Sequence, residues 1–227
     1  NTDIEGNTLP AASYNLSYND KESGLSAYTF CMCPGGYVVN ASSEEGMTCV
    51  NGMSYHNRDG ENSNSAIIVT IGEDIYGRNL LDGMRFQREI EKKTFELGEG
   101  KVPVQRYVDF KNNKVSEKIG EIKPSVESSY KLSNLREIYP EQIDEMIIKA
   151  IEYMGNRLEG FSHDDAILSA AETRSSSPIR MLRDSDSKAI NLDNLYLVGE
   201  GSGYSGGIVS SAVDGIKAAE NILRMKN

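Results

Sequence analysis

The chain has 227 residues, of which 38% are hydrophobic and 26% charged, a balance typical of a folded protein with one large domain or two small ones. Its formal net charge of -10 would repel phosphate groups, so we expect no nucleic-acid and no membrane partner. The apolar runs are too short to span a bilayer, and no signal peptide is recognisable.

The cysteines and histidines indicate neither a disulfide framework nor a metal site. Cys31, Cys33 and Cys49 are an odd number, which argues against a disulfide-stapled secreted fold and favours a reducing, cytoplasmic compartment. His56 and His163 are far apart in the sequence, and no zinc-ligand spacing results. We therefore predict no metal.

The first half of the chain is predicted to begin irregularly and then to form strands and a helix. Residues 1–24 are polar and predict irregular chain. An apolar stretch at 27–39, broken by Pro34-Gly35-Gly36, predicts two strands around a tight turn. The β-branched run 66–71 predicts a buried strand, and helical spacing of apolar residues predicts a helix over 80–97.

The middle of the chain contains the clearest helix. Weak alternation predicts a strand at 102–110, and the polar segment 111–129 predicts a loop. Residues 140–158 carry one apolar stripe opposite Glu and Lys, and a proline stands at the first position, so they predict a helix. A strand is predicted at 166–171. A composition shift then suggests two parts, residues 1–162 and 163–227.

A glycine-rich turn near the carboxyl end is the most informative feature. A short strand is predicted at 195–198, a turn at 199–207 and a helix at 208–225 with an apolar stripe. Glycines let the backbone adopt positive φ and approach a ligand, and the free amides of a helix start favour an anionic or electron-rich group. The turn lacks the following strand and acid of the common dinucleotide fingerprint. The alternative is a tight connection that binds nothing.

Several stretches together resemble one family, in the family's order. They are TFCMCPGGYVV (29–39), VNGMSYHNRDGENSNSAIIV (50–69), PVQRYVDF (103–110), ETRSSSPIRM (172–181) and GEGSGYSGGIVSSAVDGIKAAE (199–220). The chain resembles bacterial FAD-dependent dehydrogenases of the glutathione-reductase-like, two-dinucleotide-binding class. The resemblance implies an α/β fold, with an α+β substrate or cap lobe at 1–162 and, at 163–227, the terminal strand and helix of a Rossmann-like FAD lobe.

The resemblance also implies an oxidoreductase in which FAD carries a hydride, with NAD(P)H as a candidate donor and an unknown small-molecule substrate. By this analogy Glu200 binds the ribityl chain, and the helix start lies near the pyrimidine edge of the flavin. The residues assigned to the cofactor are Gly199, Glu200, Gly201, Gly203, Tyr204, Gly206, Gly207 and Ile208. The family's amino-terminal GxGxxG is absent, so we expect these 227 residues alone to bind FAD weakly or not at all, and exposed sheet edges to favour a homo-oligomer.

Arg174, Ser175, Ser176 and Arg180 are candidates for binding a substrate or an anion. Arginines around a flexible serine triplet suit an anion clamp. The alternative is that these arginines, with the nearby Arg183, pair with the neighbouring acids Glu172, Asp184 and Asp186.

Cys31, Cys33 and His56 are the candidate catalytic residues. The C-x-C pair could form a redox dithiol, and His56 could donate a proton. Two small buried hydrophobes and an inert loop histidine are the alternatives. Besides a flavoenzyme, the sequence leaves open a non-catalytic binding module of flavoprotein-like fold and a thiol redox protein that uses Cys31 and Cys33.

Overall fold

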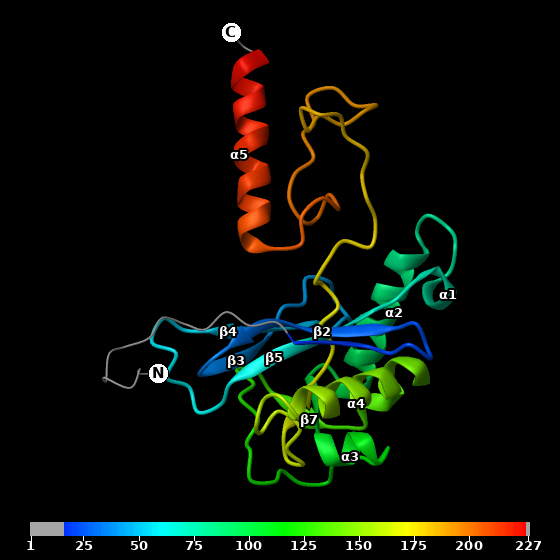
Figure 1. The fold of residues 1–227 in the computed structure, drawn as a ribbon, viewed down its shortest axis with the longest axis vertical. Helices are drawn as coiled ribbons and strands as arrows, with labels where there is room; N and C mark the ends of the chain where they lie inside the picture. Colours follow the sequence, from blue (N-terminus) through cyan, green and yellow to red (C-terminus); the bar gives the residue numbers. More distant parts are fainter. Residues whose placement is uncertain (1–15, 226–227) are drawn as a thin grey trace.

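The computed structural model describes residues 16–225 and combines helices with small β-sheets, which confirms the expected mixture of α and β structure (Figure 1). The strands are β1 (Ser17–Asn19), β2 (Ser26–Cys33), β3 (Gly36–Asn40), β4 (Val50–Ser54), β5 (Asn64–Thr70), β6 (Val102–Arg106), β7 (Tyr130–Leu132) and β8 (Ile167–Ser169). The helices are α1 (Glu73–Tyr76), α2 (Asp82–Gly98), α3 (Tyr107–Lys111), the short η1 (Leu135–Glu137), α4 (Glu141–Gly155) and α5 (Ile208–Met225).

The strands form separate small sheets. Strand β2 pairs antiparallel with β1 and β5, and β3 pairs antiparallel with β4. Strand β6 lies between β7, to which it is parallel, and β8, to which it is antiparallel. The register of β2 shifts between Phe30 and Cys33, and the chain then turns at Gly35, where φ is 52°. The predicted turn is therefore present, but β2 and β3 pair with different partners.

Helix α4 connects the parts of the core because its apolar residues recur at helical spacing. Met146, Ala150 and Met154 are buried against Ala27 of the β1-β2-β5 sheet. Ile148 belongs to a second cluster, which includes buried residues of α2 and η1. The helix therefore buries apolar surface on more than one side, whereas the sequence predicted a single apolar stripe.

Several predicted elements need correction. Residues 102–110 are a strand only as far as Arg106, where helix α3 begins. Tyr107 and Phe110 are both buried, and this three-residue spacing suits a helix; Arg106 also bonds to Asp109 in the first helical turn, at 2.9 Å. Strand β1 lies in the segment predicted to be irregular, and strands β4 and β7 were not predicted. Residues 1–15 of that segment lie outside the described residues.

The predicted strand at 195–198 is also wrong. The Leu197 amide bonds to the Ser187 carbonyl at 2.8 Å, and the Ala189 amide bonds to the Leu195 carbonyl at 2.9 Å. The segment therefore folds back on residues 187–189 and joins none of the sheets formed by the described residues. An apolar run of four residues carries too little information to specify its pairing partner.

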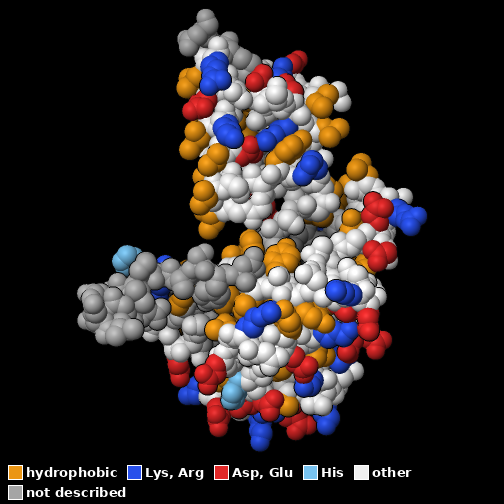
Figure 2. All heavy atoms as spheres, in the orientation of Figure 1, with side chains coloured by type: hydrophobic (Ala, Val, Ile, Leu, Met, Phe, Trp, Pro, Cys, Tyr) orange, Lys and Arg blue, Asp and Glu red, His pale blue; other side chains and the backbone are white. Residues whose placement is uncertain are grey.

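Helix α5 stands apart from the sheets, and its amino end is the end nearer to them (Figure 1). The sequence predicts an apolar stripe on this helix, but that stripe is solvent-exposed: 90% of Ile208, 60% of Ile216 and 64% of Leu223 are accessible. The opposite side, with Asp214 and Ala218, packs on the preceding segment. Figure 2 shows apolar side chains gathered over this part of the molecule.

One buried carboxylate makes the stability of the fold depend on pH. Asp144 of α4 is buried, and its Oδ1 atom has no hydrogen-bond partner among residues 16–225. Burial raises the pKa of Asp144 to about 7, and Arg136, whose Nε lies 3.8 Å away, opposes this only in part. The folded protein thus holds a proton that the unfolded chain releases near its ordinary pKa of 3.8. This residue therefore destabilises the fold increasingly as the pH rises from about 4 to about 7.

We expect Asp144→Asn to raise the Tm at about pH 8, and to raise it much less at about pH 5, because the amide carries no charge to desolvate. Thermal unfolding followed by circular dichroism at both pH values measures this difference. Glu145→Gln is the matched control, since Glu145 is an exposed partner of the same Arg136. An Asp144→Asn profile parallel to that of the wild type would contradict the explanation.

Candidate functional site

A cavity of about 810 Å³ lies among the sheets and helices of the first 178 residues. Helix α4 contributes Ile143, Ile147 and Ile151, while α2 contributes Phe86 and Ile90. Strands β5 and β8 supply further walls. Because aliphatic and aromatic residues of several elements converge here, the space suits the apolar body of a small molecule.

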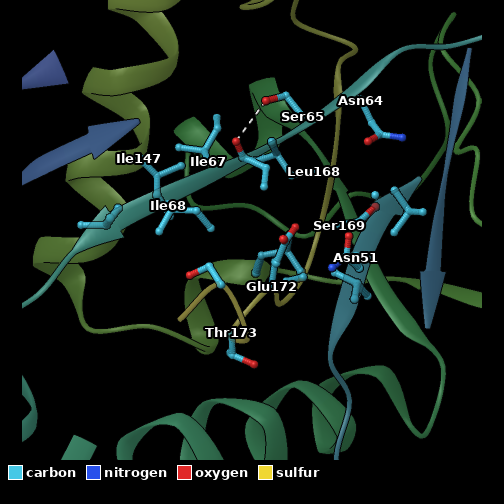
Figure 3. A pocket seen from close by; sticks show the side chains of 18 of the residues that line it. Asn51, Asn64, Ser65, Ile67, Ile68, Ile147, Leu168, Ser169, Glu172 and Thr173 are labelled. Carbon is cyan, nitrogen blue, oxygen red and sulfur yellow. Dashed lines mark hydrogen bonds between the residues drawn. The ribbon is translucent and has the colours of Figure 1, made fainter. Parts of the chain in front are cut away.

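Glu172 is a half-buried acid in the lining of this cavity. It follows the end of β8, and its Oε1 atom is buried with no hydrogen-bond partner among the described residues. Burial raises the pKa of Glu172 to about 7. Figure 3 shows apolar side chains such as Ile68 and Leu168 on one side of it. On the other side lie Asn51 and Ser169. Glu172 can therefore hold or release a proton near neutral pH.

The position of Glu172 is fixed by the residues that follow it. Arg174 donates to both oxygens of Glu91, with Nε–Oε1 2.9 Å and Nη2–Oε2 2.8 Å, and the Thr173 hydroxyl donates to Oε1 at 2.6 Å. Glu91 of α2 is buried. Although burial raises the pKa of Glu91, its bonds with Arg174 and Thr173 lower it more, so the carboxylate stays charged. This ion pair ties the segment to α2.

The serine triplet leads from the cavity to the glycine turn. Ser175, Ser176 and Ser177 all line the cavity. The Ser177 hydroxyl donates to the carbonyl of Ile179 at 2.8 Å and to that of Gly201 at 3.4 Å. The glycine turn therefore lies directly against residues that form the cavity mouth.

Arginine side chains hold the turn in place. Arg180 donates to the carbonyl of Gly203 at 2.9 Å, and its guanidinium lies 5.0 Å from the ring centre of Tyr204. The Arg183 guanidinium lies 3.9 Å from the same ring centre and forms two 2.8 Å bonds to Asp214 of α5. Each of the three arginines thus has a partner within the protein. The acidic partners are Glu91 and Asp214, which are distant in sequence, and not the neighbouring acids that the sequence suggested.

Asp214 also fixes the start of the turn. Its Oδ2 atom accepts from the amide of Gly199 at 2.9 Å. The bonds from Arg183 and from this amide lower the pKa of Asp214 to about 2. At Gly203, where φ is 85°, an added Cβ would lie 2.5 Å from the carbonyl oxygen of Ile179, so only glycine fits.

Comparison with known proteins places the chain in a family. Residues 1–175 match a family model described as FAD-dependent protein, C-terminal domain-like. The chain belongs to this family. It is also 46% identical over 218 residues to an uncharacterized protein of Clostridium beijerinckii, an alignment that covers 95% of this chain and 41% of that protein. The chain thus spans less than half the length of this relative.

The glycine turn leaves backbone groups accessible to a ligand. A Cβ built on Gly201 or Gly206 would meet nothing within 4 Å, so the backbone is open to a ligand. Among the described residues, none accepts a hydrogen bond from the amides of Ile208 or Val209, at the start of α5. These amides can donate to a cofactor. Glu200 and Ile208 are exposed, and Tyr204 is half-buried beneath the arginines.

The residues predicted from the sequence to be catalytic lie outside the cavity lining: Cys31, Cys33 and His56. Cys31 is exposed at a positive φ of 44°, and Cys33 donates to its carbonyl at 3.4 Å. Burial raises the pKa of both thiols, and Glu172 raises it further. Neither thiol is thus activated as a thiolate. His56 is exposed in the turn after β4. In the part of the chain that the structure describes, no group of three or more His, Cys, Asp or Glu could hold a metal, and no helix could cross a membrane.

The sequence analysis did not identify Glu172 as a site residue. It also did not identify Glu91 and Asp214, which hold the arginines of the serine and glycine segments. Glu172 entered only as a surface partner for the arginines, whereas Glu91 and Asp214 are separated from them in sequence. One signal was available, because Glu172 is a lone acid directly after the predicted apolar strand 166–171.

We expect Arg174→Gln to lower the free energy of unfolding by about 2 kcal/mol, because Glu91 would stay buried without its cation. The loss is smaller than the roughly 3–5 kcal/mol of a fully buried pair, since 33% of the Arg174 side chain is exposed. Urea denaturation measures it. Arg88→Gln, which breaks an exposed pair with Glu44, is the control and should cost less than about 0.5 kcal/mol. Unchanged stability in Arg174→Gln would instead favour an anion clamp.

Proposed function

We propose that this chain is the substrate-cavity part of an FAD-dependent oxidoreductase, a dehydrogenase that moves a hydride between a small molecule and the flavin. One observation carries the proposal. Ser177 lines the cavity, and its hydroxyl also contacts the Gly201 carbonyl of the glycine turn, at 3.4 Å. A substrate in the cavity would therefore lie beside whatever the turn binds, which is the geometry that direct transfer requires.

Different residues of the chain would bind the cofactor, enclose the substrate and transfer a proton. FAD, when bound, supplies the hydride acceptor or donor. Gly206 and Ile208 would present free amides, and α5 its positive end, to the electron-rich edge of the ring, while the Gly207 amide is held by the Ser210 hydroxyl at 3.1 Å. The apolar cavity walls would exclude water from the substrate, and Glu172 would accept or return a proton.

The remainder of the FAD site would be formed by another part of the protein that packs on α5. The apolar stripe of α5, which includes Ile208 and Ile216, is exposed in residues 16–225. Contiguous apolar surface of this kind usually belongs to an interface. The relative from Clostridium beijerinckii extends well beyond the part that this chain matches. Both facts support an FAD-binding lobe that packs on α5.

A thiol redox protein is less well supported. Its mechanism needs a thiolate, and the pKa values of Cys31 and Cys33 are both raised. A non-catalytic binding module would use the same cavity without a flavin. It would differ from the proposed enzyme in lacking the visible absorbance of bound FAD.

We expect Gly207→Val in the complete gene product to weaken FAD binding at least about tenfold, because the side chain would occupy the cofactor face of the turn. The fold should persist, since a Cβ at Gly207 meets only the Ser210 hydroxyl, at 3.5 Å. Visible absorbance of the purified protein and titration with FAD measure the effect.

Gly215→Val is the matched control, because it makes the same change within α5, the helix that begins after Gly207, and its Cβ would have no neighbour within 4 Å. This variant should retain FAD. A yellow Gly207→Val protein of unchanged affinity would contradict the assignment of the turn, and a colourless wild type would favour the binding module.

A further inference from the structure

The cavity has an unusual charge pattern. Among the described residues that line it, none is Lys, Arg or His, whereas two, Glu61 and Glu172, are acidic. Glu61 is exposed at the edge, and Glu172 is inside. An anionic ligand would find no cation in this space and would face a carboxylate, so the lining selects against negative charge.

Glu172 forms no hydrogen bond or ion pair with residues 16–225. Its Oε1 atom is buried and accepts no hydrogen bond from the described residues, and the nearby Arg174 is turned away to Glu91. The titratable groups that face it are Cys31 and Cys33 of β2 and Tyr139 before α4. These groups are neutral in their ordinary state near pH 7, so no cation among the described residues compensates the carboxylate.

We propose that the cavity binds an organic cation, a protonated amine on an apolar body, with its ammonium group paired to Glu172. The proposal rests on the proposed function, for which it names the substrate class. An ammonium group would supply the missing donor to Oε1 and the missing countercharge.

The walls of the cavity suit the remainder of such a molecule. Ile67, Ile68 and Leu168 offer apolar contact, and aromatic rings such as Tyr139 and Phe86 also line the space. Aromatic faces attract cations as well as apolar groups. The amine would be charged near neutral pH, because aliphatic amines have a pKa of about 10.

The proton balance of binding follows from the position of Glu172. Burial raises the pKa of this carboxyl to about 7. A bound ammonium favours the charged carboxylate, so binding at or below about pH 7 should release the proton that Glu172 holds. The affinity for an amine should therefore rise with pH until Glu172 is fully ionised, whereas a neutral ligand should show little dependence.

Three probes with the same ring and different head groups test the proposal on the purified chain without FAD: phenethylamine, phenethyl alcohol and hydrocinnamate. Isothermal titration at about pH 6 and about pH 8.5 brackets the Glu172 titration. We expect phenethylamine to bind at least about tenfold tighter than either other probe at the higher pH, a difference of about 1.4 kcal/mol. We expect hydrocinnamate to bind weakest.

Glu172→Gln should weaken phenethylamine binding at least about tenfold and change phenethyl alcohol binding by less than about twofold. Glu61→Gln is the matched control at the cavity edge and should leave both affinities within about twofold of the wild type. Circular dichroism checks that each variant folds. In the wild type, titration at about pH 6.5 in buffers of different ionisation enthalpy should show proton release with the amine and none with the alcohol.

Equal binding of the three probes, tightest binding of hydrocinnamate, no binding of any probe, or amine binding that Glu172→Gln leaves unchanged would each overturn the proposal. Absence of proton release would do so independently of the variant. Because no flavin is present in these titrations, their failure is separate from failure of the FAD assignment, which the Gly207→Val measurement tests.

Discussion

The ion pair between Arg174 and Glu91 is the interaction on which the site depends. It fixes a segment without regular structure to helix α2, through two guanidinium bonds of 2.9 and 2.8 Å and the Thr173 hydroxyl. The residue before this anchor is Glu172, and the residues after it are the serines of the cavity mouth. A buried carboxylate needs such a partner, so the same bonds that satisfy Glu91 also determine where Glu172 points.

The sequence could predict elements that have a strong local period. Helix α4 and helix α5 follow from their apolar stripes, and the turn at Pro34-Gly35-Gly36 follows from its residues. Pairing could not be predicted, because it depends on residues far apart in the chain. Local pattern does not indicate that β8 pairs antiparallel with β6, nor that the segment at 195–198 folds back on residues 187–189.

The candidate site shows the same division. Glycines with positive φ in the turn, such as Gly203, are visible in the sequence because few other residues permit that conformation. Glu172 is indicated only by its place after an apolar strand, since a glutamate looks the same in sequence whether it is paired on the surface or unpaired in a cavity. Asp214 was hidden for a related reason: it stands in the middle of a helix, yet it holds both Arg183 and the Gly199 amide.

The two halves of the proposed site have opposite electrostatic preferences. The start of α5 presents unpaired amides and the positive end of a helix, which attract electron-rich groups. The cavity presents Glu172 and no basic side chain, which favours electron-poor ones. Ser177 lines the cavity and contacts Gly201 of the glycine turn that precedes α5. An amine would be repelled from the turn, and a flavin's electron-rich edge would be repelled from the cavity. The same charges that attract each ligand to its own place would therefore keep it out of the other.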